Sequence, residues 1–181
     1  MKRIYTLFML ITSILSGLHG QVDREFWFVA PEITSGHNCD TVPYGGIPVY
    51  LKISSLNLPT TVTIEQPANS INFPSITFSL NANETKDLNL NNRIAFLEND
   101  PPNKVNNVGI HIISTELITA YYEVGNKCNN DIYALKGKNA LGTLFYVPMQ
   151  NFFWNDSAAY NPDPYSKIDI VATEDNTTIT I

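Results

Sequence analysis

The acidic side chains and histidines of this chain are the residue types best suited to catalysis. General acid–base catalysis needs two carboxylates held across a cleft, or a histidine beside a nucleophile and an orienting acid. The acids considered for this role are Glu98, Asp100, Glu123, Glu174 and Asp175. Nothing in their spacing pairs any two of them.

The candidate bases are His37 and His111, with Ser35 and Ser114 as candidate nucleophiles. Ser35 lies in a turn-like sequence and not in a nucleophile elbow. His111 stands between two isoleucines in an alternating pattern, which predicts an outward-facing residue on a β-strand. We therefore predict no catalytic residue and no enzyme activity.

The spacing of the candidate metal ligands gives little support for a metal site. Three sets of ligand-type residues deserve comparison with known sites: His37 with Cys39 and Cys128, Asp163 with Asp169, and Asp131 with Asn129 and Asn130. The first lacks paired CxxC or HxxxH spacing, and the other two lack the D-x-[DN]-x-[DN]-G run of a calcium loop. We predict no metal and no cofactor.

Aromatic residues gather between Phe145 and Ser166, where Trp154, Tyr160 and Tyr165 alternate with Asn, Asp and Pro. Rigid amphipathic side chains of this kind suit stacking on sugar rings or contact with a protein partner. The competing interpretation is a crossover whose aromatics seal the edge of the fold, and we favour it because prolines order the segment. Trp154, Tyr160 and Tyr165 are the predicted ligand contacts if the segment is functional.

The segment ALKGKNALG lacks the spacing of a phosphate-binding loop and predicts a tight hairpin. In this hairpin Gly137 and Gly142 supply backbone freedom, while Leu135 and Leu141 pack inward.

Composition and charge exclude other classes of function. The chain has 181 residues, 11 Lys+Arg against 17 Asp+Glu, a formal net charge of -6 and 44% hydrophobic residues. This is a globular composition without the basic footprint of a nucleic-acid binder. We predict no nucleic-acid partner.

Residues 1–20 have the pattern of a secretory signal peptide. Lys2 and Arg3 precede a short apolar run that ends before Gln21. No later segment is apolar over the length of a membrane helix, so we expect no membrane span and a secreted or cell-surface location. In an exported chain, Cys39 and Cys128 favour one disulfide, with the metal site above and two free thiols as alternatives.

Period-two alternation dominates the chain after residue 20 and predicts strands at 25–30, 48–54, 61–66, 75–80, 85–90, 108–114, 118–124, 131–135, 143–147, 167–173 and 177–181. Pro, Gly and Asn separate these runs. The sequence therefore predicts an all-β fold, an antiparallel β-sandwich of jelly-roll or Ig-like type, over residues 21–166.

Residues 52–64 align without gaps on residues 169–181, an offset of 117 residues. Both copies read as strand, polar turn, strand, which predicts an internal repeat. Residues 167–181 are accordingly expected to be the opening hairpin of a second, truncated β unit, or the last strands of the first.

Five blocks resemble the IgG Fc-binding protein N-terminal domain family, in its bacterial exported branch: EFWFVAPEI, TVTIEQPAN, TAYYEV, ALKGKNALG and IVATEDNTTITI. The resemblance implies a module near the N-terminus of a large exported protein, often one with a type IX secretion sorting domain. It also implies downstream domains of the same chain as neighbours.

Together these observations predict a secreted, non-catalytic adhesion module that recognises extracellular protein or glycoprotein ligands. The alternatives are a carbohydrate-binding module and a structural spacer repeat of a large surface protein.

Overall fold

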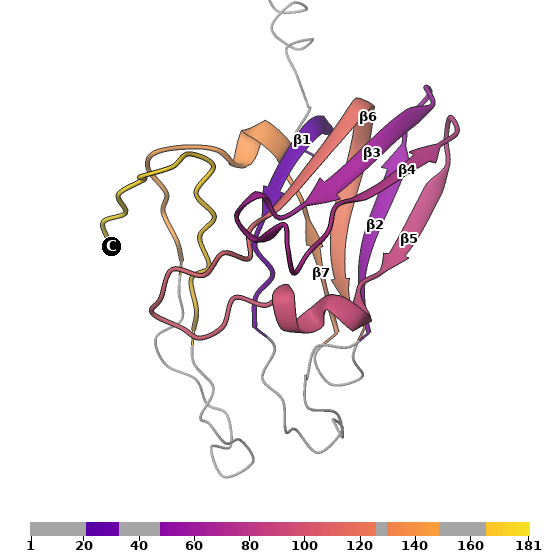
Figure 1. Ribbon diagram of the computed structural model, residues 1–181. Helices are drawn as coiled ribbons and strands as arrows, with labels where there is room; N and C mark the ends of the chain where they lie inside the picture. Colours follow the sequence, from indigo (N-terminus) through magenta and orange to yellow (C-terminus); the bar gives the residue numbers. More distant parts are fainter. Residues whose placement is uncertain (1–20, 33–47, 126–129, 149–165) are drawn as a thin grey trace, which may run out of the picture.

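Seven antiparallel strands form one curled sheet in the computed structural model, which describes residues 21–32, 48–125, 130–148 and 166–181 (Figure 1). The strands are β1 (Asp23–Phe28), β2 (Val49–Ser55), β3 (Thr60–Glu65), β4 (Ile76–Leu80), β5 (Thr85–Asn89), β6 (Ile110–Val124) and β7 (Asp131–Ala134). Three 3₁₀ turns accompany them: η1 (Pro67–Asn69), η2 (Asn91–Phe96) and η3 (Gly137–Ala140). The predicted all-β class is confirmed. The sandwich arrangement stays a prediction, because all of the described strands belong to one sheet.

Strand β6 organises the sheet. The order is β4-β3-β6-β2-β5, and β1 and β7 also pair with β6. The first half of β6 lies between β3 and β1, and its second half lies between β2 and β7. The sequence predicts two strands here, but they form a single strand of 15 residues. Hydrogen bonds hold the backbone where the partners change: Ser114 Oγ donates to the carbonyl of Glu116, and the Glu116 amide donates to Thr60 Oγ1.

The core lies on the concave face of the sheet. Alternate residues of β6, at even positions from Ile110 to Val124 apart from Glu116, are buried, as the period of a half-buried strand requires. They pack with the inward residues of the other strands, among them Phe26, Leu51, Ile53, Val62 and Ile64, all of which have no exposed surface. The odd positions of β6 form the outer face, and this face carries most of the sheet's polar side chains.

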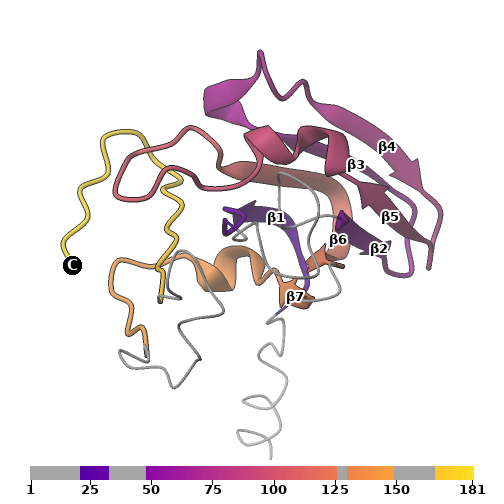
Figure 2. The same ribbon diagram turned by 90° about the horizontal axis from the view of Figure 1, so that it is seen from below.

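One cation–π contact links β4 and β5, the two end strands of the curled sheet, which lie side by side in both ribbon views (Figure 2). The ammonium group of Lys86 on β5 lies 4.8 Å from the ring centre of Phe78 on β4. Below it, the guanidinium of Arg93 lies 4.6 Å from the ring centre of Phe73 and donates to the carbonyl of Pro74. The aliphatic stems of Lys86 and Arg93 thus cover the open side of the core.

Three predicted strands are not formed. Residues 143–147, 167–173 and 177–181 have no helix or strand assignment. Their alternating sequences suit strands, but a strand forms only beside a partner. In Figure 1 the C-terminal segment lies on the opposite side of the domain from the end strands β4 and β5. The assignment of residues 167–181 to a second unit stays a prediction.

The predicted absence of a membrane-spanning segment is consistent with the structure: within the described ranges, no helix is both long enough and apolar enough to cross a bilayer.

Candidate functional site

A group of titratable side chains lies on the outer face where β1, β6 and β3 run side by side. The register places Trp27 opposite His111 on one flank and Glu65 opposite His111 on the other. Glu25 lies two residues before Trp27 and therefore shares its face. We call Glu25, Trp27, Glu65 and His111 the histidine clasp.

Both ring nitrogens of His111 face carboxylates. Nε2 lies 3.0 Å from Glu25 Oε1, and Nδ1 lies 3.1 Å from Glu65 Oε1. The Trp27 ring stacks on the imidazole with the ring centres 4.0 Å apart and the planes 13° from parallel. Trp27 Nε1 also donates to Glu25 Oε1 at 3.3 Å. The His111 side chain is only 12% exposed, whereas both glutamates are about one-third exposed.

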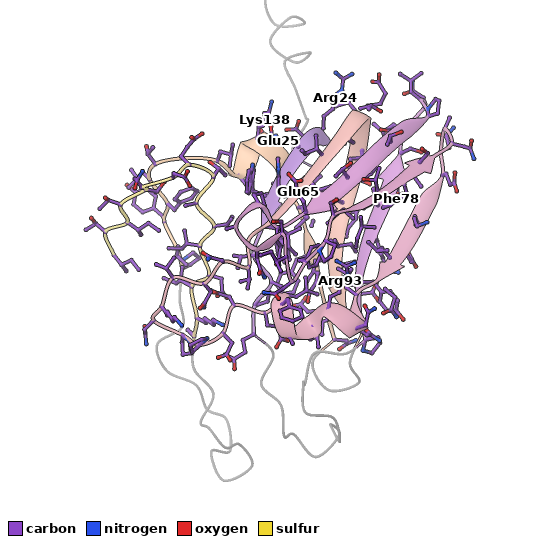
Figure 3. All side chains as sticks on the ribbon, in the orientation of Figure 1. Arg24, Glu25, Glu65, Phe78, Arg93 and Lys138 are labelled. Carbon is purple, nitrogen blue, oxygen red and sulfur yellow. The ribbon has the colours of Figure 1, made fainter. Side chains whose placement is uncertain are left out.

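A lysine extends the clasp toward η3. Lys138 Nζ lies 3.8 Å from Glu25 Oε2, and Figure 3 shows the two side chains close together above Glu65. The lysine backbone is fixed by Asp23, whose Oδ2 accepts a hydrogen bond from the Lys138 amide. Gly137, just before it, has a φ of +54° and lies so close to Asp23 that a Cβ would come within 2.4 Å. Only glycine fits this position, so the predicted role of Gly137 is confirmed.

The rest of the hairpin prediction for this segment is partly wrong. Residues 137–140 form a 3₁₀ turn, and Leu141 is 48% exposed instead of packing inward, whereas Leu135 is buried. Strand β7 ends at Ala134, and the next residue, Leu135, still reaches the core. The chain then leaves the sheet, and the 3₁₀ turn that follows packs against β1.

The clasp does not form a catalytic triad. Ser114, which the sequence offered as a candidate nucleophile, is buried and donates to the carbonyls of Arg24 and Glu116. The acids that do face His111 are Glu25 and Glu65, neither of which belongs to the set considered from the sequence. The arrangement therefore cross-links three strands through one imidazole.

A second buried titratable group lies on the opposite face of β6. Tyr122 has no exposed surface, and its hydroxyl finds no hydrogen-bond partner among the described residues. Burial, reinforced by the negative charge of Glu98, raises the pKa of the Tyr122 phenol well above its ordinary value. Its ring packs at 4.9 Å from that of Phe28 and 6.1 Å from that of Tyr133. Burial, followed by the charge of Asp131, also raises the pKa of Tyr133.

A polar network attaches the C-terminal segment to the domain. Lys167 Nζ donates to the carbonyl of Asn99 at 2.9 Å and lies within 3.6 Å of both Glu32 and Asp169. Asn99 Nδ2 donates to Asp169 Oδ1 at 2.6 Å. The Asp169 carboxylate, a calcium candidate from the sequence, is thus used in a structural contact. The described residues contain no cluster of three His, Cys, Asp or Glu side chains suited to a metal ion.

An apolar run is exposed beside this network. Five side chains of residues 141–147 are each about half exposed or more, although the segment has no regular structure: Leu141 at 48%, Leu144 at 73%, Phe145 at 61%, Tyr146 at 88% and Val147 at 52%. Contiguous exposed apolar side chains of this kind mark interaction surfaces in folded proteins. We call these residues the apolar segment.

The other predicted site residues lie outside the described residues. Cys39 falls in the range 33–47, Cys128 in the range 126–129, and Trp154, Tyr160 and Tyr165 in the range 149–165. The disulfide and the aromatic ligand contacts stay predictions.

Sequence reasoning missed the clasp because its partners are distant in the chain. Glu65 lies 46 residues from His111, and Glu25 lies 86 residues away. The only local signal was alternation: Glu25, Glu65 and His111 each stand at an outward position of a predicted strand. The order of the strands, which joins these positions, cannot be read from alternation alone.

Comparisons of the chain with protein-family models, with curated proteins and with solved structures found no match. The resemblance to the IgG Fc-binding protein N-terminal domain family stays a prediction.

Proposed function

We propose that this chain is a non-catalytic, secreted or cell-surface module that binds extracellular protein or glycoprotein ligands. The observation that supports it best is the exposure of the apolar segment. Its phenylalanine and tyrosine are side-chain types that are enriched in protein interfaces, and its leucines add apolar area. Residues 145–147 of this segment are also the start of the aromatic stretch between Phe145 and Ser166.

The chemistry of the outer face supports the same proposal. Charged residues there are engaged with one another: Lys52 lies 2.8 Å from Asp87 and 3.0 Å from Glu123, and the clasp occupies Glu25 and Glu65. Hydroxyl pairs such as Thr61 with Ser79 and Thr63 with Thr77 fill the space beside the clasp. These groups stabilise the sheet and leave recognition to the apolar segment.

The test is a binding screen of the full chain on immobilised immunoglobulin, mucin and glycan panels. We expect saturable binding to one protein or glycoprotein class, weakened at least about tenfold by Leu144→Ser or Tyr146→Ser, a loss typical of interface anchors. The matched control is Val105→Ser, because Val105 is 90% exposed and lies in a different loop. All three variants should melt as the wild type does, since the residues are exposed.

Three outcomes contradict the proposal. Binding to free glycans alone favours the carbohydrate-binding alternative and moves attention to Trp154, Tyr160 and Tyr165. Binding that is equally strong in the Leu144, Tyr146 and Val105 variants removes the apolar segment from the interface. A cooperatively melting chain that binds nothing favours the spacer repeat.

A further inference from the structure

We propose that the histidine clasp is a pH-responsive tie, which as an imidazolium locks the N-terminal strand β1 to β3 across β6 and which loosens β1 when it loses a proton. The inference is independent of the proposed binding function. It rests on the two nitrogen–carboxylate contacts of His111, on the partial burial of the ring and on the stacking of Trp27.

The proton count follows from the geometry. A carboxylate accepts hydrogen bonds and donates none, and a neutral imidazole donates through one nitrogen only. With carboxylate oxygens at 3.0 and 3.1 Å from the two ring nitrogens, both contacts are attractive only when both nitrogens carry protons. After one proton is lost, a nitrogen lone pair faces a carboxylate oxygen, and one of the two contacts becomes repulsive.

Acidic and aromatic side chains surround the ring. The neighbours that face it are Glu25 and Trp27 from β1 and Glu65 from β3. The nearest cation in this group, Lys138 from η3, contacts the far oxygen of Glu25. Two negative charges thus lie against one imidazole, and the electron-rich face of an indole covers it.

The loss of a contact in the histidine clasp affects β1 more than β3. This strand pairs with β6 alone, whereas β3 also pairs with β4. Losing the Glu25 contact therefore removes one of the side-chain attachments of β1, which is otherwise held by its pairing with β6, by the Arg24–Glu116 ion pair and by the hydrogen bond between Asp23 and Lys138. Because imidazole is the side chain whose charge ordinarily changes between pH 5 and pH 8, we expect the tie to be stronger in mildly acidic than in mildly alkaline solution.

The first test measures urea unfolding of the full chain at pH 5.5 and pH 8.5. Relative to His111→Gln, the wild type should lose stability over this range, with its unfolding constant rising by a factor of about five more than that of the variant. Glu65→Gln should also reduce the pH step, because an amide can donate to the deprotonated nitrogen. Glu123→Gln is the matched control: it lies on the outer face of β6 and faces Lys52 instead of a histidine, so it should keep the full step.

The second test follows the protonation of the His111 ring through the fluorescence of Trp27. Protonated imidazole quenches the fluorescence of a stacked indole, so in a Trp154→Phe background the Trp27 emission should rise from pH 5.5 to pH 8.5. It should not change with pH in His111→Gln. Hydrogen-exchange protection of the β1 amides, corrected for the pH dependence of the intrinsic exchange rate, should fall over the same range in the wild type.

The proposal is overturned if the stability step and the fluorescence step persist in His111→Gln, since another group then titrates. It is also overturned if His111→Gln and Glu65→Gln lower stability by the same amount at both pH values, since the clasp then acts only by packing.

Discussion

The buried hydroxyl of Tyr122 allows a sharp test of the core. Replacing Tyr122 by Phe removes a polar group that has no partner among the described residues and keeps the ring that packs on Phe28. Truncating a partnered buried hydroxyl costs about 1 kcal/mol or more, whereas removing an unsatisfied one is neutral or stabilising by a similar amount. We therefore expect Tyr122→Phe to be at least as stable as the wild type at pH 8.

The size of the contribution of Tyr122 to stability follows from the loss of stability at alkaline pH. Because the pKa of Tyr122 is higher in the folded protein than in the unfolded chain, the unfolded state loses its proton first as the pH rises above 10. The stability that the neutral phenol contributes is complete below that pH and decreases above it. At pH 11, one unit above the ordinary value, the wild type should have lost about 1.4 kcal/mol more than Tyr122→Phe relative to pH 8.

The assay is urea unfolding at pH 8 and pH 11, followed by circular dichroism. Tyr121→Phe serves as the control, because its hydroxyl lies on the outer face 3.5 Å from Gln21 and Tyr122 is left intact. The reasoning is refuted if Tyr122→Phe is destabilised by more than about 1 kcal/mol at pH 8, which would mean that the hydroxyl has a partner. An alkaline loss identical to that of the wild type would refute it as well.

The remaining predictions concern three other contacts. Gly137→Ala should destabilise by about 2 to 4 kcal/mol in thermal unfolding, from the positive φ and the collision with Asp23, and Asp23→Gly should relieve part of that cost; strict additivity of the two changes would contradict the collision. Phe26→Ala should cost about 3 to 5 kcal/mol in urea unfolding because the ring is fully buried, and a cost below about 1 kcal/mol would place it outside the core. Lys167→Gln should increase the hydrogen-exchange rate of residues 166–171 about tenfold or more, with little change in β6, because it breaks the contacts with Glu32, Asn99 and Asp169; unchanged exchange would mean that the segment is held by other contacts.

Local pattern predicted most of the strands because each alternating run had a partner to pair with. The runs at Val62–Ile64 and Ile76–Leu80 lie opposite one another in the β3–β4 pair, which residues 66–75 with the η1 turn connect. Residues 143–147 have an equally strong strand sequence but pair with no strand in the described part of the chain, so propensity alone did not produce a strand. The difference lies in tertiary pairing, which alternation does not encode.

The clasp illustrates the same limit for a functional group. An outward position for His111 was correct, but the sequence favoured a solvated surface residue, and the ring is almost covered. The Trp27 ring covers the imidazole, and Glu25 and Glu65 contact its two nitrogens. Only the register of three strands brings these residues together. A sequence shows which side of a strand a residue occupies, and not what lies across from it.

The position of β6 within the sheet has a consequence for how the domain is built. Four strands pair with β6, and three of them precede it in the chain. A polypeptide that emerges N-terminus first can form the β3–β4 hairpin early, but β1 has no partner until residues 110–118 have followed it. Non-local pairing of this kind makes folding slow. Strand β1 thus stays unpaired, and the β3–β4 and β2–β5 pairs stay separate, until β6 appears and joins them into one sheet.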